Sequence, residues 1–563
     1  MNTIVFRIED ATNNRTKPDI KVQAEQGKNI LELMQEMNIA IDAPCSGNGT
    51  CGKCRIKIIG GDVDMKKNPR LSEDDFNDGW RLACQCSVHS DAIIWVPAAA
   101  SAFKNNIQTA DISTPEELAR YEENIKNIFL SGVENKQSES GVGIAIDIGT
   151  TTCTAAMLDL QTGKVLAKAS MGNGQIRYGA DVINRIIQQS KEGGVEKLKK
   201  AILDETLIPI IESLIKESGK NKEDISRFVI AGNTTMEHLL VGADAQSIRL
   251  EPYVPEFLER DGDTAKSIGL IGKDDAKVIF APNVGSYVGG DITAGVLDTL
   301  LWNGDEMCLF IDLGTNGELV FGNRDYMLTC ACSAGPAFEG GDISCGMRAT
   351  KGAIDSIKLE DETFEPTYTL ISGDKPLGLC GSGLIAIISE LFRTKAINAK
   401  GKFVGKSSRI RYDEEIGSGE YIVATKDESA SGMEITLNES DLDNFIRAKG
   451  AIFSAIQTML KSLDMDIEVI DKVIIAGGIG SGIDMEKAIS IGMLPKIDIS
   501  KYSYIGNSSL TGACAMLLSD DATNKVFEIG RNMTYIELST YPGYMDELLA
   551  ACFIPHTDAT LFD

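Results

Sequence analysis

The first part of the chain carries the alternation of hydrophobic and polar positions that half-buried β-strands show. Apolar residues occupy every second position over residues 4–8 and 20–24, and the alternation returns over residues 55–59. Residues 29–37 (NILELMQEM) have the spacing of a short amphipathic helix, and a closing strand is expected near residues 93–96. A hairpin, a helix, a loop and further strands in this order predict a β-grasp domain.

Two regions of different character follow. The sequence STPEE at residues 113–117 places proline and acidic residues where a helix begins, so we expect a helical linker there. From residue 142 onward, apolar runs end in glycine turns and alternate with longer amphipathic helices, which is typical of α/β lobes. Two stretches echo each other: IAIDIGTTT begins at Ile144 and LFIDLGTNG begins at Leu309. The echo predicts two related lobes.

Composition narrows the function classes. The chain has 563 residues, 43% hydrophobic and 24% charged, an ordinary globular balance that excludes disorder and collagen-like classes. The net charge of −27 repels phosphate backbones and anionic lipid, so we expect no nucleic-acid and no membrane partner. No apolar run approaches a membrane span, and no secretory signal is recognised. The 13 cysteines of so large a chain suggest a metal rather than a disulfide scaffold, and we expect a cytoplasmic protein.

Four cysteines near the N-terminus have the spacing C-x5-C-x2-C-x29-C: Cys45, Cys51, Cys54 and Cys84. A tight pair and a distant fourth thiolate are typical of ferredoxin 2Fe–2S sites, although the plant type has x4 in the first gap. Zinc and the absence of metal are the alternatives, but zinc sites usually show two close pairs. Cys86 competes with Cys84 as fourth ligand, because both lie in RLACQCSV, which we expect to be a strand with the two side chains on one face.

The echoed hairpins have the chemistry of a nucleotide site. Asp147 and Asp312 end their strands and can hold Mg²⁺ through water, while the following glycines and hydroxyls can reach phosphate. One such hairpin is a weak signal, since Asp-Gly also forms plain turns. Two copies and a late glycine element (VIIAGGIGSG) favour an ATP site over a degenerate or structural one. The residues expected to bind the nucleotide are Gly149, Thr150, Thr151, Gly314, Thr315 and Asn316 at the phosphates and Gly477 and Gly478 at the adenosine.

With these residues in hand, the chain resembles the ATP-dependent reductive activators of corrinoid proteins. The resemblance covers nearly the whole chain and rests on GWRLACQ around Cys84, the two hairpins, YGADVINRI from Tyr178, AGNTTMEHLL from Ala231 and CSAGPAFEGG from Cys332. It implies a fold: an α+β β-grasp 2Fe–2S ferredoxin domain, a helical linker and two α/β actin-like (RNase H-like) ATPase lobes. In the family the cysteine of RLAC is the fourth ligand, which favours Cys84.

The resemblance also implies a function. The protein would bind a 2Fe–2S cluster, ATP and Mg and pass one electron from the cluster to Co(II) of a corrinoid protein, restoring Co(I) for methyl transfer. Its partners would be a corrinoid protein of a methyltransferase system and an upstream electron donor, with a homodimer left open. The loop from Cys332 to Gly341 would face the corrin, with the Ser333 hydroxyl on the cobalt side. The cysteines Cys330, Cys332, Cys345 and Cys380 fit no ligand pattern and are expected to be buried thiols.

Two alternatives stay open at this point. One is an ATP-driven electron donor to another low-potential enzyme, and the other is a non-catalytic redox-responsive nucleotide sensor. The expected domains are residues 1–100 (ferredoxin-like domain), 101–140 (helical linker), 141–230 (first actin-like lobe) and 231–563 (second lobe, with loops facing the corrinoid partner).

Overall fold

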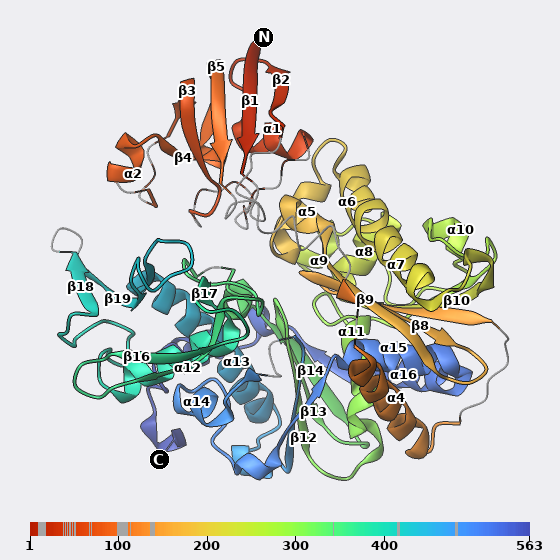
Figure 1. Cartoon of the computed structure of the whole chain (residues 1–563). Helices are drawn as coiled ribbons and strands as arrows, with labels where there is room; N and C mark the ends of the chain where they lie inside the picture. The colour runs from red at the N-terminus through yellow and green to blue at the C-terminus, as the bar shows by residue number, and fades with distance from the viewer. Residues whose placement is uncertain are drawn as a thin grey trace.

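A computed structural model gives the fold, which Figure 1 shows from the N-terminal module to the C-terminus. The structure describes residues 1–9, 18–37, 39, 41, 43, 47, 49, 52–66, 68, 70–71, 73–97, 111–112, 114–134, 141–341, 343–413, 417–478 and 482–562.

The N-terminal module is a five-stranded sheet with one short helix on its core. Its strands, in spatial order, are β2 (Ile20–Ala24), β1 (Asn2–Ile8), β5 (Cys86–Val96), β3 (Arg55–Met65) and β4 (Trp80–Leu82). The helix α1 (Ile30–Glu36) buries its apolar side chains in the module's own core, and α2 (Glu73–Asn77) precedes β4. The parallel pairing of β1 with β5 between antiparallel neighbours is the β-grasp arrangement that the alternation predicts.

The rest of the chain contains two six-stranded sheets of the same design. The first has the order β11 (Lys277–Phe280), β10 (Ile225–Gly232), β7 (Val142–Ile148), β8 (Thr152–Asp159), β9 (Val165–Gly172) and β6 (Asp111–Ile112). The second has the order β22 (Tyr502–Gly506), β21 (Lys472–Ala476), β12 (Cys308–Leu313), β13 (Gly317–Gly322), β14 (Met327–Cys332) and β23 (Met533–Ile536).

The pairing of the strands is duplicated as well. In each sheet the strand that carries the aspartate pairs antiparallel with the strand after its hairpin and parallel with a strand from much later in the chain. The two similar stretches that begin at Ile144 and Leu309 therefore belong to a duplicated actin-like topology, and the predicted fold class is confirmed.

Helices between the two sheets join the lobes. The helices α11 (Gly290–Thr299), α15 (Ser508–Leu518) and α16 (Asp520–Asn532) share one hydrophobic core with apolar residues of both sheets. The outer face of the first sheet is covered by another set: α5 (Val182–Gln189), α6 (Gly194–Ile202), α7 (Ile208–Ser218), α8 (Thr234–Val241), α9 (Gln246–Arg249) and α10 (Ala265–Ile268).

The second lobe carries additional elements on its outer side. They comprise two small sheets and four helices: β15 (Ala353–Leu359), β16 (Pro366–Leu370) and β17 (Gly378–Leu379); β18 (Ile410–Asp413), β19 (Ser418–Ala424) and β20 (Ile435–Asn438); α12 (Gly381–Arg393), α13 (Glu439–Ser462), α14 (Met485–Ser490) and α17 (Tyr544–Ala551). Their apolar side chains form the largest core of the molecule with the second sheet.

Two of the expected domain boundaries, which stay predictions, lie within or beside elements that pair with the first sheet. The boundary between residues 230 and 231 falls inside β10, and the first sheet continues to β11, which pairs with β10. The region expected as a linker includes β6, which pairs with β9, and α4 (Pro115–Leu130), which buries Ile125 and Ile128 in the inter-lobe core. These elements belong to the first lobe, because they complete its sheet and core. The helix begins as predicted, with Thr114 and Glu117 forming a capping box.

Candidate functional site

Two of the four cysteines predicted to bind iron lie together in the ferredoxin module. The Sγ atoms of Cys54 and Cys84 are 3.4 Å apart, and both side chains belong to the buried core of the module. This distance exceeds a disulfide bond of about 2.05 Å. It is close to the roughly 3.8 Å between two thiolates that share a tetrahedral metal at about 2.3 Å. Cys45 and Cys51 lie outside the described residues. The described pair fits one half of the expected donor set.

Polar side chains fix the backbone around this pair. Asn29 caps α1 with its Oδ1 atom, and its Nδ2 atom donates a 3.0 Å hydrogen bond to the Cys84 carbonyl. Gln85 Nε2 donates to the Gly47 carbonyl at 3.3 Å and lies 3.6 Å from Cys84 Sγ. Gly49 has φ +76°, and a Cβ there would lie 2.8 Å from Gln85 Nε2. Glycine is favoured at Gly49 because its φ lies in the left-handed region, where a residue with a side chain would be strained.

The competing cysteine, Cys86, has a different environment. The expected continuous strand RLACQCSV is interrupted by a 3-10 turn, η1 (Ala83–Gln85), so that Cys84 lies in the turn and Cys86 begins β5. Burial raises the pKa of Cys86 to about 12. The 3-10 turn, and not a continuous strand, separates Cys84 from Cys86. The expectation that both side chains share one face of a strand is therefore wrong, and the turn favours Cys84.

The two predicted phosphate hairpins meet at their tips. Asp147 and Asp312 are the penultimate residues of β7 and β12, and a short turn follows each of these strands. The hydroxyl oxygens of Thr151 and Thr315 are 2.7 Å apart, so the turns of the two lobes are joined by a direct hydrogen bond. The duplicated topology thus brings together residues that are far apart in the sequence.

Asp147 is a half-buried carboxylate with two neutral donors. Asn507 Nδ2 donates to its Oδ2 atom at 2.7 Å and Ser509 Oγ donates to its Oδ1 atom at 2.9 Å. Burial raises the pKa of Asp147, and these two hydrogen bonds and the charge of Lys168 oppose the rise. Asn507 and Ser509 are at the start of α15, so two hydrogen bonds join this inter-lobe helix to the first hairpin.

Three further carboxyl groups surround this position, and two of them were not predicted from the sequence. Burial, then the charge of Asp147, raises the pKa of Asp312 to about 7. Asp291, in the first turn of α11, has its pKa raised to about 8 by burial and then by Asp312 and Asp147. Burial raises the pKa of Glu318 on β13 well above its usual range, with Asp291 and Asp312 adding to the rise. Half-buried and buried acids that repel one another favour the binding of a cation among them.

Carboxylate oxygens are among the ligands that magnesium ions take in proteins. No group of three His, Cys, Asp or Glu side chains is arranged to chelate a metal in the part of the chain that the structure describes. Mg²⁺ commonly keeps several waters and takes one or two carboxylates together with substrate phosphates. Asp147 and Asp312 are carboxylates near the ends of β7 and β12, and their role toward Mg²⁺ stays a prediction.

The third predicted element, the glycine run after β21, reaches the same place. A Cβ at Gly477 would lie 2.3 Å from the Leu313 carbonyl oxygen and 2.7 Å from Asp312 Oδ1, and its φ is +96°. The glycine is required because the backbone passes directly against the second hairpin. Gly478 follows it in the same turn.

The other predicted phosphate residues lie in the two turns. Arg185 donates a hydrogen bond to the Thr150 carbonyl, and Gly149 N and Gly314 N close their turns on Thr152 O and Asn316 O. The side chain of Asn316 also forms a hydrogen bond with Glu318, which opposes the rise of the Glu318 pKa.

The loop expected to face a corrin follows β14. Ser333 is exposed, whereas Ala334 and the preceding Cys332 are buried. Cys330 and Cys380 are buried free thiols, and Cys345 is a partly buried free thiol. Cys380 is the N-cap residue of α12, and its Sγ atom lies 3.2 Å from the Ile354 carbonyl oxygen.

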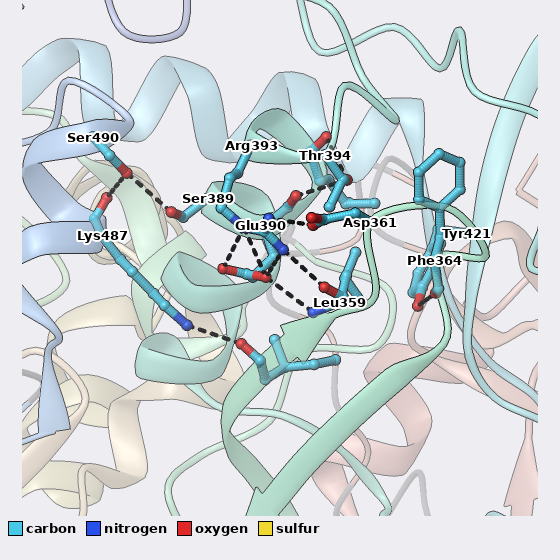
Figure 2. Close-up of polar contacts among 12 residues, drawn as sticks. Leu359, Asp361, Phe364, Ser389, Glu390, Arg393, Thr394, Tyr421, Lys487 and Ser490 are labelled. Atoms are coloured by element: carbon cyan, nitrogen blue, oxygen red, sulfur yellow. Dashed lines mark hydrogen bonds and ion pairs between the residues drawn. The ribbon is translucent and has the colours of Figure 1, made fainter.

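A polar network holds α12 in the second lobe (Figure 2). Glu390 is buried and accepts from Arg393 and from the Leu359 amide at 2.9 Å. Burial acts to raise the pKa of Glu390, but these hydrogen bonds outweigh it, so the pKa is lowered. Lys487 of α14 donates to the Ile357 carbonyl at 2.9 Å. The network fixes the C-terminal end of α12. The N-terminal end of α12 lies near the third glycine element, because a Cβ at Gly482 would lie 3.3 Å from Ser382 Oγ.

Comparisons with known proteins agree with this geometry. The family model described as "C-terminal domain of RACo the ASKHA domain" matches residues 306–563, "RACo middle region" matches residues 142–303, and "2Fe-2S iron-sulfur cluster binding domain" matches residues 13–89. A solved structure of a reductive activator for a corrinoid, iron-sulfur protein is 38% identical, with a TM-score of 0.69, and the match covers 100% of both chains.

The chain belongs to the ATP-dependent reductive activators of corrinoid proteins. The corrinoid activation enzyme RamQ of Eubacterium limosum is 29% identical over 93% of this chain and 96% of its own length. A Co(II) methylated amine-specific corrinoid protein reductase of Methanosarcina barkeri is 24% identical over 70% of this chain and 73% of its own. Within the described residues of this activator, no helix is long and apolar enough to cross a bilayer.

Proposed function

We propose that this activator transfers one electron from a 2Fe–2S cluster to Co(II) of a corrinoid protein, restoring Co(I), and that it couples the transfer to ATP. Family membership supports ATP-dependent reductive activation of a corrinoid protein. The observation that carries the proposal is the presence, in one chain, of a paired-thiol ferredoxin module and a duplicated acidic nucleotide site.

Each cofactor has a proposed set of residues. The cluster binds Cys45, Cys51, Cys54 and Cys84. Mg·ATP binds between the two hairpins, with Asp147 and Asp312 on the metal side and the turn residues Gly149, Thr150, Thr151, Gly314, Thr315 and Asn316 on the phosphates. Gly477 and Gly478 approach the adenosine, and the exposed Ser333 hydroxyl contacts the cobalt side of the partner.

Energetics explain why the two modules share one chain. A plant-type 2Fe–2S centre has a potential near about −400 mV, and the family's reaction implies a still lower cobalt couple, so the transfer runs uphill. A nucleotide-bound state that prefers one form of the partner about 10⁴-fold supplies about 5.5 kcal/mol. At about 59 mV per tenfold for one electron this preference equals roughly 0.24 V. An upstream donor then re-reduces the cluster.

The proposal is tested with Asp147→Ala and Asp312→Ala. Both variants should lose ATP hydrolysis and keep the visible spectrum of the cluster, because both carboxylates are on the metal side and far in sequence from the cysteines. Asp325→Ala, at the exposed turn between β13 and β14, is the matched control and should hydrolyse ATP normally. Unchanged hydrolysis in both site variants would contradict the proposed nucleotide site.

A further inference from the structure

Fully buried polar side chains of the first lobe contact the first phosphate hairpin. Asn173 follows β9 and is the N-cap residue of the 3-10 turn η2 (Gly174–Tyr178), which contains Gln175. Arg185 lies on α5, within the segment YGADVINRI, to which the proposed function gives no role. All three side chains are buried. Because a buried guanidinium costs free energy unless its donors are satisfied, the acceptors of Arg185 show what the buried charge holds in place.

Three consecutive carbonyl groups of the hairpin accept hydrogen bonds from Asn173 and Arg185. Asn173 Nδ2 donates to the Gly149 carbonyl at 2.9 Å, and the amide of Asn173 donates to the Thr151 carbonyl at 2.8 Å. Between these two, Arg185 Nη2 donates to the Thr150 carbonyl. Each of the three peptide groups of the turn is therefore held by its carbonyl oxygen.

A held carbonyl also fixes the direction of the amide in the same peptide group. The peptide group is planar and trans, so its C=O and N–H bonds point in opposite directions. The carbonyl groups of Gly149 and Thr150 are directed at Asn173 and Arg185, so the N–H groups of Thr150 and Thr151 point away from these buried side chains. Successive backbone N–H groups in a turn form concavities that bind anions.

The segment around Arg185 fixes the guanidinium in turn. Nε donates to the Gly179 carbonyl at 2.8 Å and Nη1 donates to Gln175 Oε1 at 3.3 Å. A Cβ at Gly179 would lie 2.8 Å from the backbone nitrogen of Arg185, so glycine lets the chain pass against the first turn of α5. Asp181 caps this helix by accepting from the amide of Asn184 at 2.7 Å. The segment thus places the guanidinium at the hairpin.

We propose that Asn173 and Arg185 are positioning residues for ATP, which direct the amides of Thr150 and Thr151 at the phosphate oxygens. This inference rests on the proposed ATP site. The two side chains act through the peptide groups of the hairpin and not by contact with the phosphates. Their replacement weakens the binding of a ligand that carries phosphates and leaves the binding of adenosine, which carries none, unchanged.

The test compares two variants of the full chain. Arg185→Lys keeps the charge but loses the planar fork that reaches Gly179 and Thr150 together. Asn173→Ser keeps an oxygen that can cap η2 and removes the Nδ2 donor to Gly149. The dissociation constants of Mg·ATP and of adenosine are measured by displacement of a fluorescent ATP analogue. Each variant should bind Mg·ATP about tenfold more weakly than wild type, because a hydrogen bond to a charged group is misdirected, and should bind adenosine as wild type does.

Gln189→Met is the matched control for a loss of stability. Gln189 is a buried residue of the same helix, and it donates to the Ala243 carbonyl at 2.7 Å and accepts from the amide of Ala245 at 2.9 Å. The substitution removes these hydrogen bonds and leaves those to the hairpin in place. It should lower the unfolding temperature of the chain and keep the wild-type affinity for Mg·ATP.

Each outcome decides the inference. Wild-type affinity for Mg·ATP in both Arg185→Lys and Asn173→Ser would overturn it, as would an equal loss in Gln189→Met or an equal loss for adenosine. Wild-type protein that binds Mg·ATP no more tightly than adenosine would overturn the proposed ATP site and the inference with it. Variants that bind Mg·ATP and reduce cobalt in an ATP-dependent manner as wild type does would refute the positioning role and leave the proposed function intact.

Discussion

Replacing Asp312 by Asn should make the nucleotide-free protein more stable while abolishing ATP hydrolysis. Asp312 is half-buried, and burial, followed by the charge of Asp147, raises its pKa from 3.8 to about 7. Asparagine keeps the shape of the side chain and removes the charge. The substitution therefore removes the cost of burying the Asp312 charge and its repulsion by Asp147.

The size of the effect follows from linkage between protonation and folding. For a carboxyl whose folded pKa is raised, stability is full below the unfolded value of 3.8 and is lost as the pH rises to about 7. At pH 7 the penalty is roughly 4 kcal/mol, and at pH 5 it is less than half of that. Since Asp147, Asp291 and Glu318 share the repulsion, we expect Asp312→Asn to recover about 2–4 kcal/mol at pH 7.

The assay is thermal unfolding of the full chain at pH 7 and pH 5 without nucleotide. The unfolding temperature of the ATPase lobes should rise by roughly 2–5 °C at pH 7 and by less than half of that at pH 5. Asp325→Asn, an exposed acid on the same lobe, should shift stability by no more than about 0.5 kcal/mol. A variant less stable than wild type at pH 7, or a gain that does not shrink at pH 5, would refute the reasoning.

Two other predictions concern the cluster and the second lobe. Cys84→Ser should weaken or abolish the visible charge-transfer spectrum and Cys86→Ser should leave it nearly intact, and the reverse result would show that the ligand assignment is wrong. Arg393→Ala removes the cation that is hydrogen-bonded to the buried Glu390. In a urea titration the free energy of unfolding of the second lobe should fall by about 2 kcal/mol, a value reduced because Arg393 is partly exposed. An unchanged midpoint would show that the network of Figure 2 contributes no stability.

The elements that could be predicted from the sequence are those that depend on local pattern. Period-two alternation locates the strands of the β-grasp module, and the capping box of Thr114 and Glu117 starts α4. The repeated hairpin sequences predict the duplicated lobes, because the same residues make the same turn twice. Asp147 and Asp312 are found for this reason, and the structure brings their turns together through Thr151 and Thr315.

The features that could not be predicted depend on contacts between distant segments. Asp291 and Glu318 join the acidic cluster only because α11 and β13 converge on it, and the sequence signal was a single acid after Gly289 and Gly290. The polar face of α4 suggests a linker, yet its apolar stripe is buried against the lobes. The alternation in RLACQCSV suggests a strand, but the turn at Ala83–Gln85 places Cys84 beside Cys54 instead.

The central claim is that ATP drives electron transfer from the cluster to cobalt. The most direct measurement is the absorption band of Co(I) in a mixture of the purified activator, a low-potential reductant and the cognate Co(II) corrinoid protein, recorded with and without Mg·ATP. The account predicts that the band forms only when Mg·ATP is present and that one electron is transferred per cluster in each cycle. Equal formation of Co(I) with ATP omitted would contradict the coupling and would identify the protein as a simple ferredoxin-type carrier.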